Sequence, residues 1–235
     1  MPATPDAFDQ STYQVRLEWG IEGLARLAPA DVIVVVDVLR FSSTVIQAVE
    51  RGEAVGLDAA ADAVSINGAA VARAAGKTGA VVMLGAMRNP AAVAAAVLAV
   101  QEERAARTSI AVIACGELSS REPGSPLRFA VEDLLGAGAV IAALTDIGVD
   151  HSSPEAAAAG EAFRALRGAT RHLLAASGSG RELALRHAHG PEAQGPGIQG
   201  PQAPGAGPRD EVAAAAAVDA ASVVPLLRDG VFVAF

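Results

Sequence analysis

The sequence predicts a three-layer αβα sandwich built on a mixed, mostly parallel sheet. Strand-like apolar runs alternate along the chain with stretches of helical length and composition. The run Val32–Val36 consists of five β-branched residues, as expected for a strand that is covered on both faces. Strands that alternate with helices in this way form a largely parallel sheet with helices on both sides. The first and last strands are expected at antiparallel edges, which makes the sheet mixed.

The elements follow one another in a regular order. Residues 13–19, YQVRLEW, alternate polar and apolar side chains and predict the first strand. Ser153 precedes a proline and an acid, which is typical of a helix start, and Ser179 and Glu182 have the spacing of a capping box. The remaining strands are expected at 32–37, 53–57, 79–85, 108–114, 223–227 and 231–235, the last two as a hairpin about Asp229-Gly230, and the remaining helices at 44–50, 67–75, 91–104 and 127–144.

One segment differs in composition from the rest of the chain. Residues 189–208, HGPEAQGPGIQGPQAPGAGP, are rich in glycine and proline and have almost no apolar anchors. Such a segment cannot bury enough surface to offset its ordering entropy. Helix and strand patterns resume after it, so we expect a flexible insert within one α/β domain over residues 1–235. A linker to a separate domain is the weaker alternative, because too few residues follow it to form a core.

Composition narrows the functional class. The chain of 235 residues is 51% hydrophobic, which indicates a globular protein. Its net charge of −8 and its aromatic content of 3% argue against a nucleic-acid partner. No apolar run reaches the length of a membrane span and the N-terminus lacks a signal peptide, so we expect a cytoplasmic protein without a membrane partner. A homodimer is compatible with the sequence. The single cysteine, Cys115, excludes an internal disulfide.

Polar residues follow the strand at 32–36 without a turn between them. Ligands in open α/β sheets bind beyond the carboxyl ends of the strands, and Asp37 stands at such an end. Ser43 and Thr44 lie at the start of the next helix, whose N–H groups suit a phosphate or sulfonate, and Arg40 can clamp the same anion. Asp37 is therefore predicted to hold a divalent cation or to act as a nucleophile. The alternative is that Asp37 caps the next element and pairs with Arg40 at the surface.

Further polar residues stand before helices. Asn67 can donate to a phosphate or orient a water, and Gly68 lets the backbone approach a ligand closely, although a bare Asn-Gly is more often a turn. Arg88 follows the strand at 79–85 in a similar way, and alone it would be a surface arginine. The turn from Ser177 to Arg181, SGSGR, enters a helix and is a candidate for a second anion pocket.

Acidic residues supply candidates for metal ligands. Glu117 follows the strand at 108–114 at its carboxyl end. Glu132 and Asp133 are adjacent within an apolar helix, where they are costly to bury unless a cation or an arginine satisfies them. Adjacent helical residues point about 100° apart, so we expect one of them to bind while the other orients a neighbour or faces solvent. The alternative is a solvated helix edge.

These blocks, in this order, resemble the 2-phosphosulfolactate phosphatase family, the magnesium-dependent phosphatases of coenzyme M synthesis. The blocks are VVDVLRFSST (35–44), Asn67-Gly68, LGAMRNPAAV (84–93), ACG (114–116), FAVEDLLGAG (129–138) and SGSGREL (177–183). The resemblance covers about residues 13–235 apart from the insert. It implies a three-layer αβα fold, a Mg²⁺ cofactor, and hydrolysis of the phosphate monoester of a small sulfonated or carboxylated hydroxy acid.

The resemblance and the residue patterns together define the predicted site. Asp37 stays open as metal ligand, base or nucleophile. The segment from Leu57 to Asn67 has no room for a Gly-Asn-Ser-Pro element of the family, and Ala69 stands where the family has threonine. This departure motivates a second hypothesis, a non-catalytic anion-binding or regulatory protein on the same scaffold. The predicted catalytic residues are Asp37, Arg40 and Asn67, the substrate-binding residues are Arg40, Ser43, Thr44, Gly68, Arg88, Ser177 and Arg181, and the metal ligands are Asp37, Glu132 and Asp133, with Glu117 as a further acid.

Overall fold

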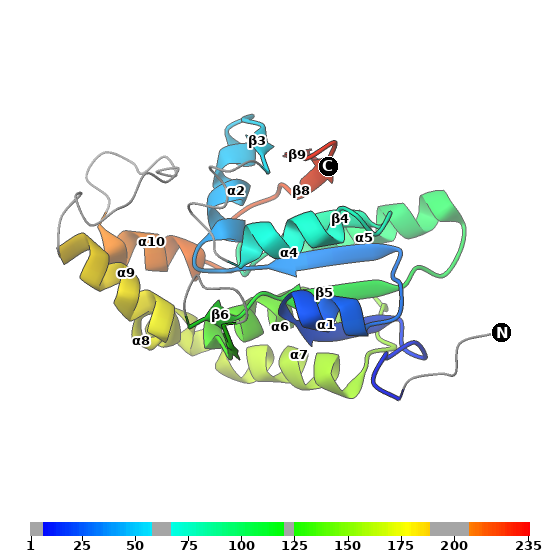
Figure 1. Ribbon diagram of the computed structural model, residues 1–235, viewed down its shortest axis with the longest axis horizontal. Coiled ribbons are helices and arrows are strands. Elements are labelled where there is room, and N and C mark those ends of the chain that lie inside the picture. Colours follow the sequence, from blue (N-terminus) through cyan, green and yellow to red (C-terminus); the bar gives the residue numbers. More distant parts are fainter. Residues whose placement is uncertain (1–6, 58–66, 120–124, 189–206) are drawn as a thin grey trace.

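The computed structural model describes residues 7–57, 67–119, 125–188 and 207–235, which form a layered α/β domain (Figure 1). Within these residues a seven-stranded sheet has the order β1-β5-β2-β4-β8-β9-β3. A two-stranded hairpin, β6-β7, forms a second sheet. The strands are β1 (Val15–Trp19), β2 (Val32–Val36), β3 (Val55–Gly56), β4 (Val81–Gly85), β5 (Ile110–Ala114), β6 (Glu117–Leu118), β7 (Leu127–Arg128), β8 (Pro225–Arg228) and β9 (Val231–Ala234).

The direction of the strands confirms the predicted mixed sheet. Strands β1, β5, β2 and β4 are parallel, whereas β8, β9 and β3 continue the sheet in antiparallel register. The antiparallel direction predicted for the last strand is therefore confirmed, although β9 lies inside the sheet because β3 pairs beyond it. The same prediction for the first strand is wrong, because Val15 pairs with Ile110 in parallel register. Alternation of polar and apolar residues reports which face of a strand is covered and carries no information on its direction.

Helices cover both faces of the sheet and complete the predicted three layers (Figure 1). Residues of α1, α2 and α4 pack in one apolar cluster, and residues of α5, α6 and α7 pack in another cluster on the opposite face. The short helices α8, α9 and α10 lie beyond the carboxyl ends of β2 and β5. The helices are α1 (Gly20–Arg26), α2 (Phe41–Glu50), α4 (Gly68–Ala75), α5 (Pro90–Arg104), α6 (Val131–Asp146), α7 (Pro154–Leu166), α8 (Thr170–Ala176), α9 (Gly178–Ala188) and α10 (Pro208–Ala215).

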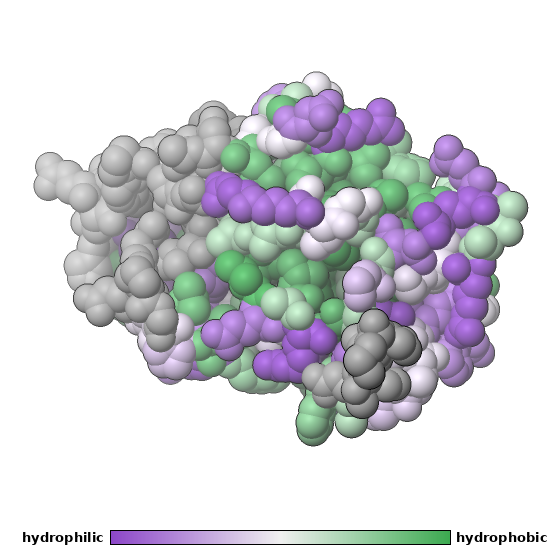
Figure 2. Space-filling model, turned by 45° about the vertical axis from the view of Figure 1, so that its right-hand side comes forward, coloured by the Kyte–Doolittle hydropathy of each residue, from purple (hydrophilic) through white to green (hydrophobic). Residues whose placement is uncertain are grey.

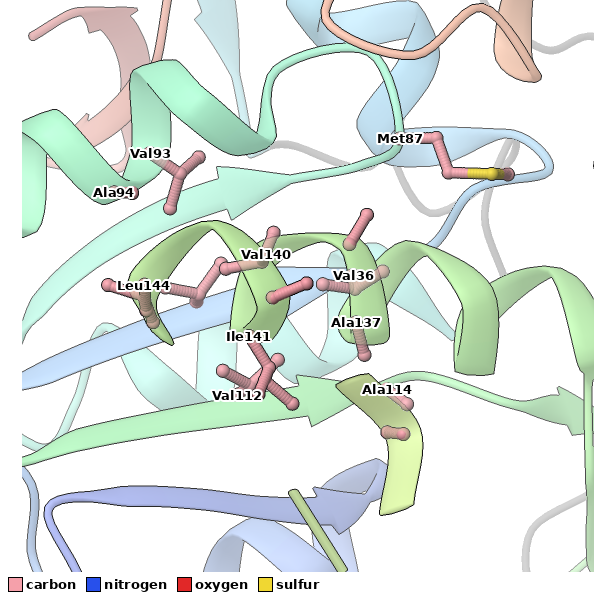
Figure 3. Close-up of a cluster of buried hydrophobic side chains, with 14 of the residues drawn as sticks. Val36, Met87, Val93, Ala94, Val112, Ala114, Ala137, Val140, Ile141 and Leu144 are labelled. Carbon is pink, nitrogen blue, oxygen red and sulfur yellow. The ribbon is translucent and has the colours of Figure 1, made fainter. Parts of the chain in front are cut away.

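The core is centred on β2, whose five residues are all buried as predicted. Val34 and Val36 face the cluster of α6, whereas Ile33 and Val35 face the cluster of α4. Side chains of α6 pack between the sheet and α5, as Figure 3 shows for Val140 and Leu144. Each fully buried valine or leucine contributes roughly 1.5–3 kcal/mol to folding, so this layer fixes where the ends of β2 and β5 lie.

Several local predictions are confirmed. The Ser153 hydroxyl accepts the N–H of Ala156 at 3.2 Å and caps α7. Strands β8 and β9 form the expected hairpin, and its turn residues Asp229 and Gly230 have φ angles of 50° and 78°. Two-residue hairpin turns need positive φ at both positions, which Asp-Gly tolerates well.

Several element boundaries differ from the prediction. Helix α6 begins at Val131, not at 127, because Leu127 and Arg128 pair with β6. Helix α9 begins before the predicted capping box, because the hydroxyl of Ser177 accepts the N–H of Gly180 at 3.0 Å. The predicted insert lies outside the described residues apart from 207–208, which begin α10.

Figure 2 shows one face of the surface, where hydrophobic side chains gather in the middle and hydrophilic ones surround them. Large apolar side chains with high exposure include Phe8, Phe129 and Leu185. Among the residues with assigned positions, no helix has the length and apolar character needed to cross a membrane.

Candidate functional site

The chain connections diverge at the carboxyl ends of β2 and β5, and the region around Asp37, Asn67, Gly116 and Asp133 is called the crevice below. These strands are parallel neighbours, yet the chain leaves β2 toward α2 and α4 on one face and leaves β5 toward α6 on the other. Ligands of open α/β sheets bind where the connections diverge in this way. Asp37 follows β2 directly, and Gly116 and Glu117 follow β5.

Asp37 connects β2 to two helices at this edge. Its side chain is buried, with an exposed fraction of 7%. One carboxylate oxygen accepts the N–H of Phe41 at 3.3 Å, and the other accepts the N–H of Gly68 at 3.1 Å. A Cβ atom at position 68 would lie 2.5 Å from this second oxygen, so only glycine permits the approach. The predicted close approach at Gly68 is therefore made to Asp37.

Asp133 joins the loops that follow β2 and β5. Its Oδ1 accepts the N–H of Val38 at 2.8 Å, and its Oδ2 accepts the N–H of Gly116 at 2.9 Å. The pKa of Asp133 is raised well above its usual value, first by burial and then by the negative charges of Asp37 and Glu132, against the effect of the two N–H donors. The carboxylates are thus close enough to repel one another.

The neighbouring cysteine is not an activated nucleophile. Cys115 is fully buried at the end of β5. Burial raises the pKa of its thiol well above the usual value, and the charges of Asp37 and Asp133 raise it further. Since the thiolate is the nucleophilic form, Cys115 acts here as a small apolar residue.

The crevice also contains a buried amide oxygen without a hydrogen-bond donor and a further buried acid. The Asn67 amide donates to the carbonyl of Gly116 at 2.6 Å, but its Oδ1 is buried without a partner. Glu132 is the further buried acid, with only 3% of its surface exposed. Within the described parts of the chain, no group of three or more His, Cys, Asp or Glu side chains is arranged to hold a metal ion. Asp37, Glu132 and Asp133 therefore do not form a three-ligand metal site by themselves.

Two of the three arginines predicted to bind substrate have partners elsewhere. Arg40 is half-exposed and lies 3.7 Å from the carboxylate of Glu211 on α10, so the alternative pairing with Asp37 is not observed. Arg88 is buried, donates to the carbonyl of Ala214 at 2.8 Å, and pairs with Glu50 at 3.2 Å. Glu50 ends α2, whereas Asp37 caps the first turn of that helix.

The comparisons with known proteins give the family. The family model described as 2-phosphosulpholactate phosphatase matches residues 58–230, which is more than half of the chain. The chain belongs to the 2-phosphosulfolactate phosphatase family. This is a family of phosphoric monoester hydrolases, so the resemblance of the ordered sequence blocks is confirmed. A search of curated proteins finds no match.

The matched region includes most of the predicted site of this phosphatase. It contains Asn67, Glu132, Asp133 and Arg181, whereas Asp37 and Arg40 lie before its first residue. The structure connects the two parts. The N–H of Gly68 donates to the Asp37 carboxylate, and the Asp133 carboxylate accepts the N–H of Val38.

The other predicted contact residues of the phosphatase have varied settings. The hydroxyl of Ser43 donates to the carbonyl of Val38 at 2.8 Å, and Thr44 is half-buried in the first turn of α2. The hydroxyl of Ser177 caps α9. Arg181 is exposed and forms no ion pair with any residue whose position is described. Roles for these residues in substrate binding stay predictions.

Sequence reasoning missed Arg128. Its guanidinium forms an ion pair with Glu117 across the β6-β7 hairpin and lies against Gly178 at the start of α9. The predicted helix at 127–144 concealed this residue, because its apolar pattern extends over Leu127. The sequence feature that could have identified this residue was its positive charge, three residues before a helix that has two acids in its first turn.

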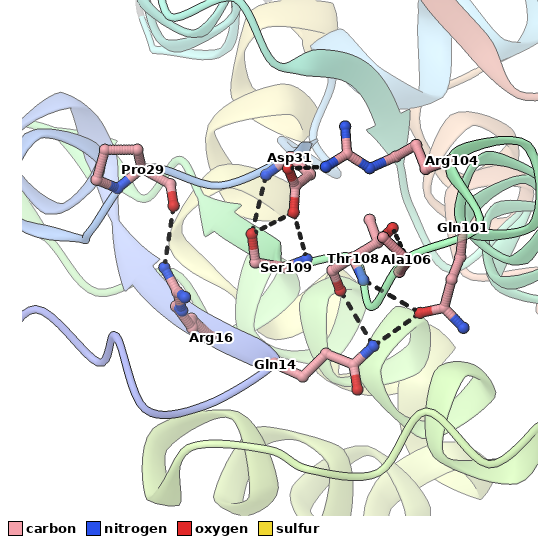
Figure 4. Close-up of polar contacts among 9 residues, drawn as sticks. All are labelled: Gln14, Arg16, Pro29, Asp31, Gln101, Arg104, Ala106, Thr108 and Ser109. Carbon is pink, nitrogen blue, oxygen red and sulfur yellow. Dashed lines mark hydrogen bonds and ion pairs between the residues drawn. The ribbon is translucent and has the colours of Figure 1, made fainter.

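A second polar network lies at the opposite ends of the same strands, before β2 and β5 (Figure 4). The N–H and the hydroxyl of Ser109 donate to Asp31 at 2.8 and 2.7 Å, and Arg104 forms an ion pair with the same carboxylate. Burial alone would raise the pKa of Asp31, but the Ser109 hydrogen bonds and the charges of Arg104 and Arg16 together lower it. This acid is satisfied by its neighbours.

Proposed function

We propose that the protein is a magnesium-dependent phosphatase that hydrolyses the phosphate monoester of a small sulfonated or carboxylated hydroxy acid, such as 2-phosphosulfolactate. The observation that carries the proposal is a pair of buried carboxylates: Asp37 follows β2, and Asp133 of α6 accepts N–H groups from the loops after β2 and β5. Buried acids with a raised pKa, such as Asp133, concentrate at functional sites. Membership of a phosphatase family supports the same conclusion.

The residues of the crevice fit Mg²⁺. This ion prefers oxygen ligands and is usually bound by one or two carboxylates together with water and substrate phosphate, so a complete protein cage is not required. Burial and then the charges of Asp37 and Glu132 raise the pKa of Asp133, and a cation would relieve this excess of negative charge. The buried Oδ1 of Asn67 is an acceptor without a donor. Asp37, Asp133 or Glu132, with Asn67, would hold the ion, which when bound would polarise the phosphoryl group and neutralise developing charge.

The protein groups around this position hold the reactants in place. The N–H groups of Phe41 and Gly68 fix the Asp37 carboxylate at the end of β2, where it can serve as ligand, base or nucleophile. Arg40 follows three residues later and is half-exposed. Its ion pair with Glu211 is long, at 3.7 Å, so a phosphate oxygen can take the place of the Glu211 carboxylate. The buried wall of α6 excludes water behind the site.

The chemistry of the substrate class follows from charge. A chain with a net charge of −8 repels polyanions such as nucleic acids, so a small anion held by local arginines is the favoured partner. We further propose a cytoplasmic location, and a homodimer as an assembly that light scattering can check.

Release of inorganic phosphate tests the proposal. The purified protein is incubated with 2-phosphosulfolactate, with 2-phospholactate, and with a phosphomonoester that lacks a second acid group, each with Mg²⁺ or with a chelator. We expect turnover of the acidic esters only when Mg²⁺ is present. If no ester is hydrolysed while 2-phosphosulfolactate raises the melting temperature without Mg²⁺, the protein is the anion-binding alternative instead.

A further inference from the structure

Arg128 lies at the edge of the candidate site with its guanidinium in solvent. It ends β7, and 61% of its side-chain surface is exposed. Its ion pair with Glu117 crosses the hairpin that follows β5. A guanidinium has five N–H donors in a planar fork, so one carboxylate leaves donors available for a second anion.

The backbone of Arg128 is tied to the crevice residues. A Cβ atom on Gly116 would lie 2.9 Å from the carbonyl oxygen of Arg128, so these two segments are in direct contact. The N–H of Gly116 donates to Asp133, and its carbonyl accepts from Asn67. The negative charge of Glu132 also reaches the guanidinium and, after the Glu117 hydrogen bond and charge, helps to raise its pKa.

The start of α9 leaves space for this guanidinium. A Cβ atom on Gly178 would lie 2.5 Å from Nη2 of Arg128 and 3.3 Å from its Cζ. A larger residue at position 178 would therefore occupy the place of the guanidinium. Ser177 holds this turn by capping the N–H of Gly180.

A substrate with more than one negative group needs positively charged side chains to bind at this acidic site. Arg88 is buried between α2 and α10, and Arg40 follows Asp37 at the β2 end, where the phosphate is proposed to bind. Arg128 belongs to the β5 side of the crevice, so it can meet a group at the other end of a small substrate.

We propose that Arg128 is a substrate-binding residue that recognises the acidic group of the substrate that is not transferred, its sulfonate or its carboxylate, and so sets specificity for acidic phosphate esters. The inference rests on the proposed function and adds the residue that selects the substrate. When no substrate is bound, the ion pair with Glu117 holds the Arg128 guanidinium at the crevice.

The test compares two esters that differ only in the sulfonate. KM and kcat are measured for Arg128→Gln and wild type with 2-phosphosulfolactate and 2-phospholactate at saturating Mg²⁺. A charge-assisted hydrogen bond lost from binding should raise KM about tenfold or more, with little change in kcat. A rise for the sulfonated ester alone assigns the sulfonate, and an equal rise for both assigns the carboxylate. Arg186→Gln, which removes another exposed ion-paired arginine, should leave KM unchanged.

A second pair of variants separates binding from a structural role of the ion pair. Glu117→Gln releases the guanidinium, so it should leave KM unchanged or lower it, whereas a purely structural pair predicts the same effect from either partner. Gly178→Ala should raise KM while the melting temperature changes little, because the atoms it displaces end a flexible side chain. Gly168→Ala is the control, since a Cβ there meets no atom within 4 Å.

The proposal is overturned if wild type hydrolyses the acidic esters and Arg128→Gln keeps the wild-type KM for both. It is also overturned if Arg128→Gln and Glu117→Gln raise KM equally. Absence of turnover by the wild type would instead contradict the proposed function.

Discussion

Two aspartates flank β2, and their surroundings differ sharply. Asp31 precedes the strand and receives two hydrogen bonds from Ser109 and an ion pair from Arg104. Asp37 follows the strand and lies beside a second buried carboxylate, Asp133. The pKa of Asp31 is lowered, whereas the pKa of Asp133 is raised well above its usual value.

The difference is in how far the surroundings of each acid compensate its negative charge. Positive and N–H groups around Asp31 compensate its charge, so this end of the sheet is stabilised by its polar groups. At the other end, backbone N–H groups hold two acids that repel each other, an arrangement that costs stability unless a cation is present. The uncompensated charge at the carboxyl ends of the strands is the reason that we propose a cation-dependent site there.

The largest effect is expected from Asp133→Ala. The N–H groups of Val38 and Gly116 would lose their acceptor, at a cost of roughly 1–3 kcal/mol each, partly offset by the repulsion that disappears. We expect the free energy of unfolding, from urea titration, to fall by roughly 2 kcal/mol and phosphatase turnover to be lost. Asp133→Asn keeps one acceptor and should lose less stability. A variant as stable and as active as wild type would contradict the role of Asp133 as the tie between the two loops.

A smaller effect is expected at the amino end. Ser109→Ala removes the hydroxyl that donates to Asp31 and accepts its N–H, so it should lower the free energy of unfolding by about 1 kcal/mol and leave turnover unchanged. Ser152→Ala is the matched control, because the Ser152 hydroxyl is buried without a partner and its removal should cost nothing. Loss of turnover in folded Ser109→Ala would show that the two ends of the sheet are coupled.

Much of this comparison was predictable from the sequence. Five β-branched residues gave a strand covered on both faces, and the position after it placed Asp37 at the ligand-binding edge. The turn Asp229-Gly230 and the cap at Ser153 were equally clear, because each depends on residues close in sequence.

The remaining features depend on contacts between distant segments. No local pattern shows that Asp133 binds the N–H groups of Val38 and Gly116. The three residues are far apart in the sequence, because Asp133 is on α6 and the other two follow different strands. Arg128 was missed for the same reason, because its two-residue strand exists only by pairing with β6. The direction of β1 likewise depends on β5, which enters the sheet later in the chain.

The smallest effects are expected in the pH dependence of stability, where the two acids act in opposite directions. The lowered pKa of Asp31 means that its contribution is present above the usual carboxyl pKa and is lost as pH falls through its folded value. The raised pKa of Asp133 means that, without a cation, stability falls as pH rises from the usual carboxyl pKa toward the folded value.

Urea midpoints measured from about pH 3 to about pH 8 should resolve these slopes. Asp31→Asn should reduce the loss of unfolding free energy at low pH by less than about 1 kcal/mol, because Asp31 is partly solvated. Asp133→Asn should weaken the loss toward neutral pH, and Mg²⁺ should do the same in wild type. Identical slopes in both variants would show that the two acids have equivalent surroundings.

Mg²⁺-dependent phosphate release by Asp31→Asn and Asp37→Asn tests the central claim most directly. The two substitutions are chemically identical and flank one strand, and circular dichroism confirms that each variant is folded. The account predicts wild-type turnover for Asp31→Asn and a loss of about a hundredfold or more for Asp37→Asn. Turnover within a few-fold of wild type in folded Asp37→Asn would contradict it, and would make Asp37 a cap for α2 and α4 alone.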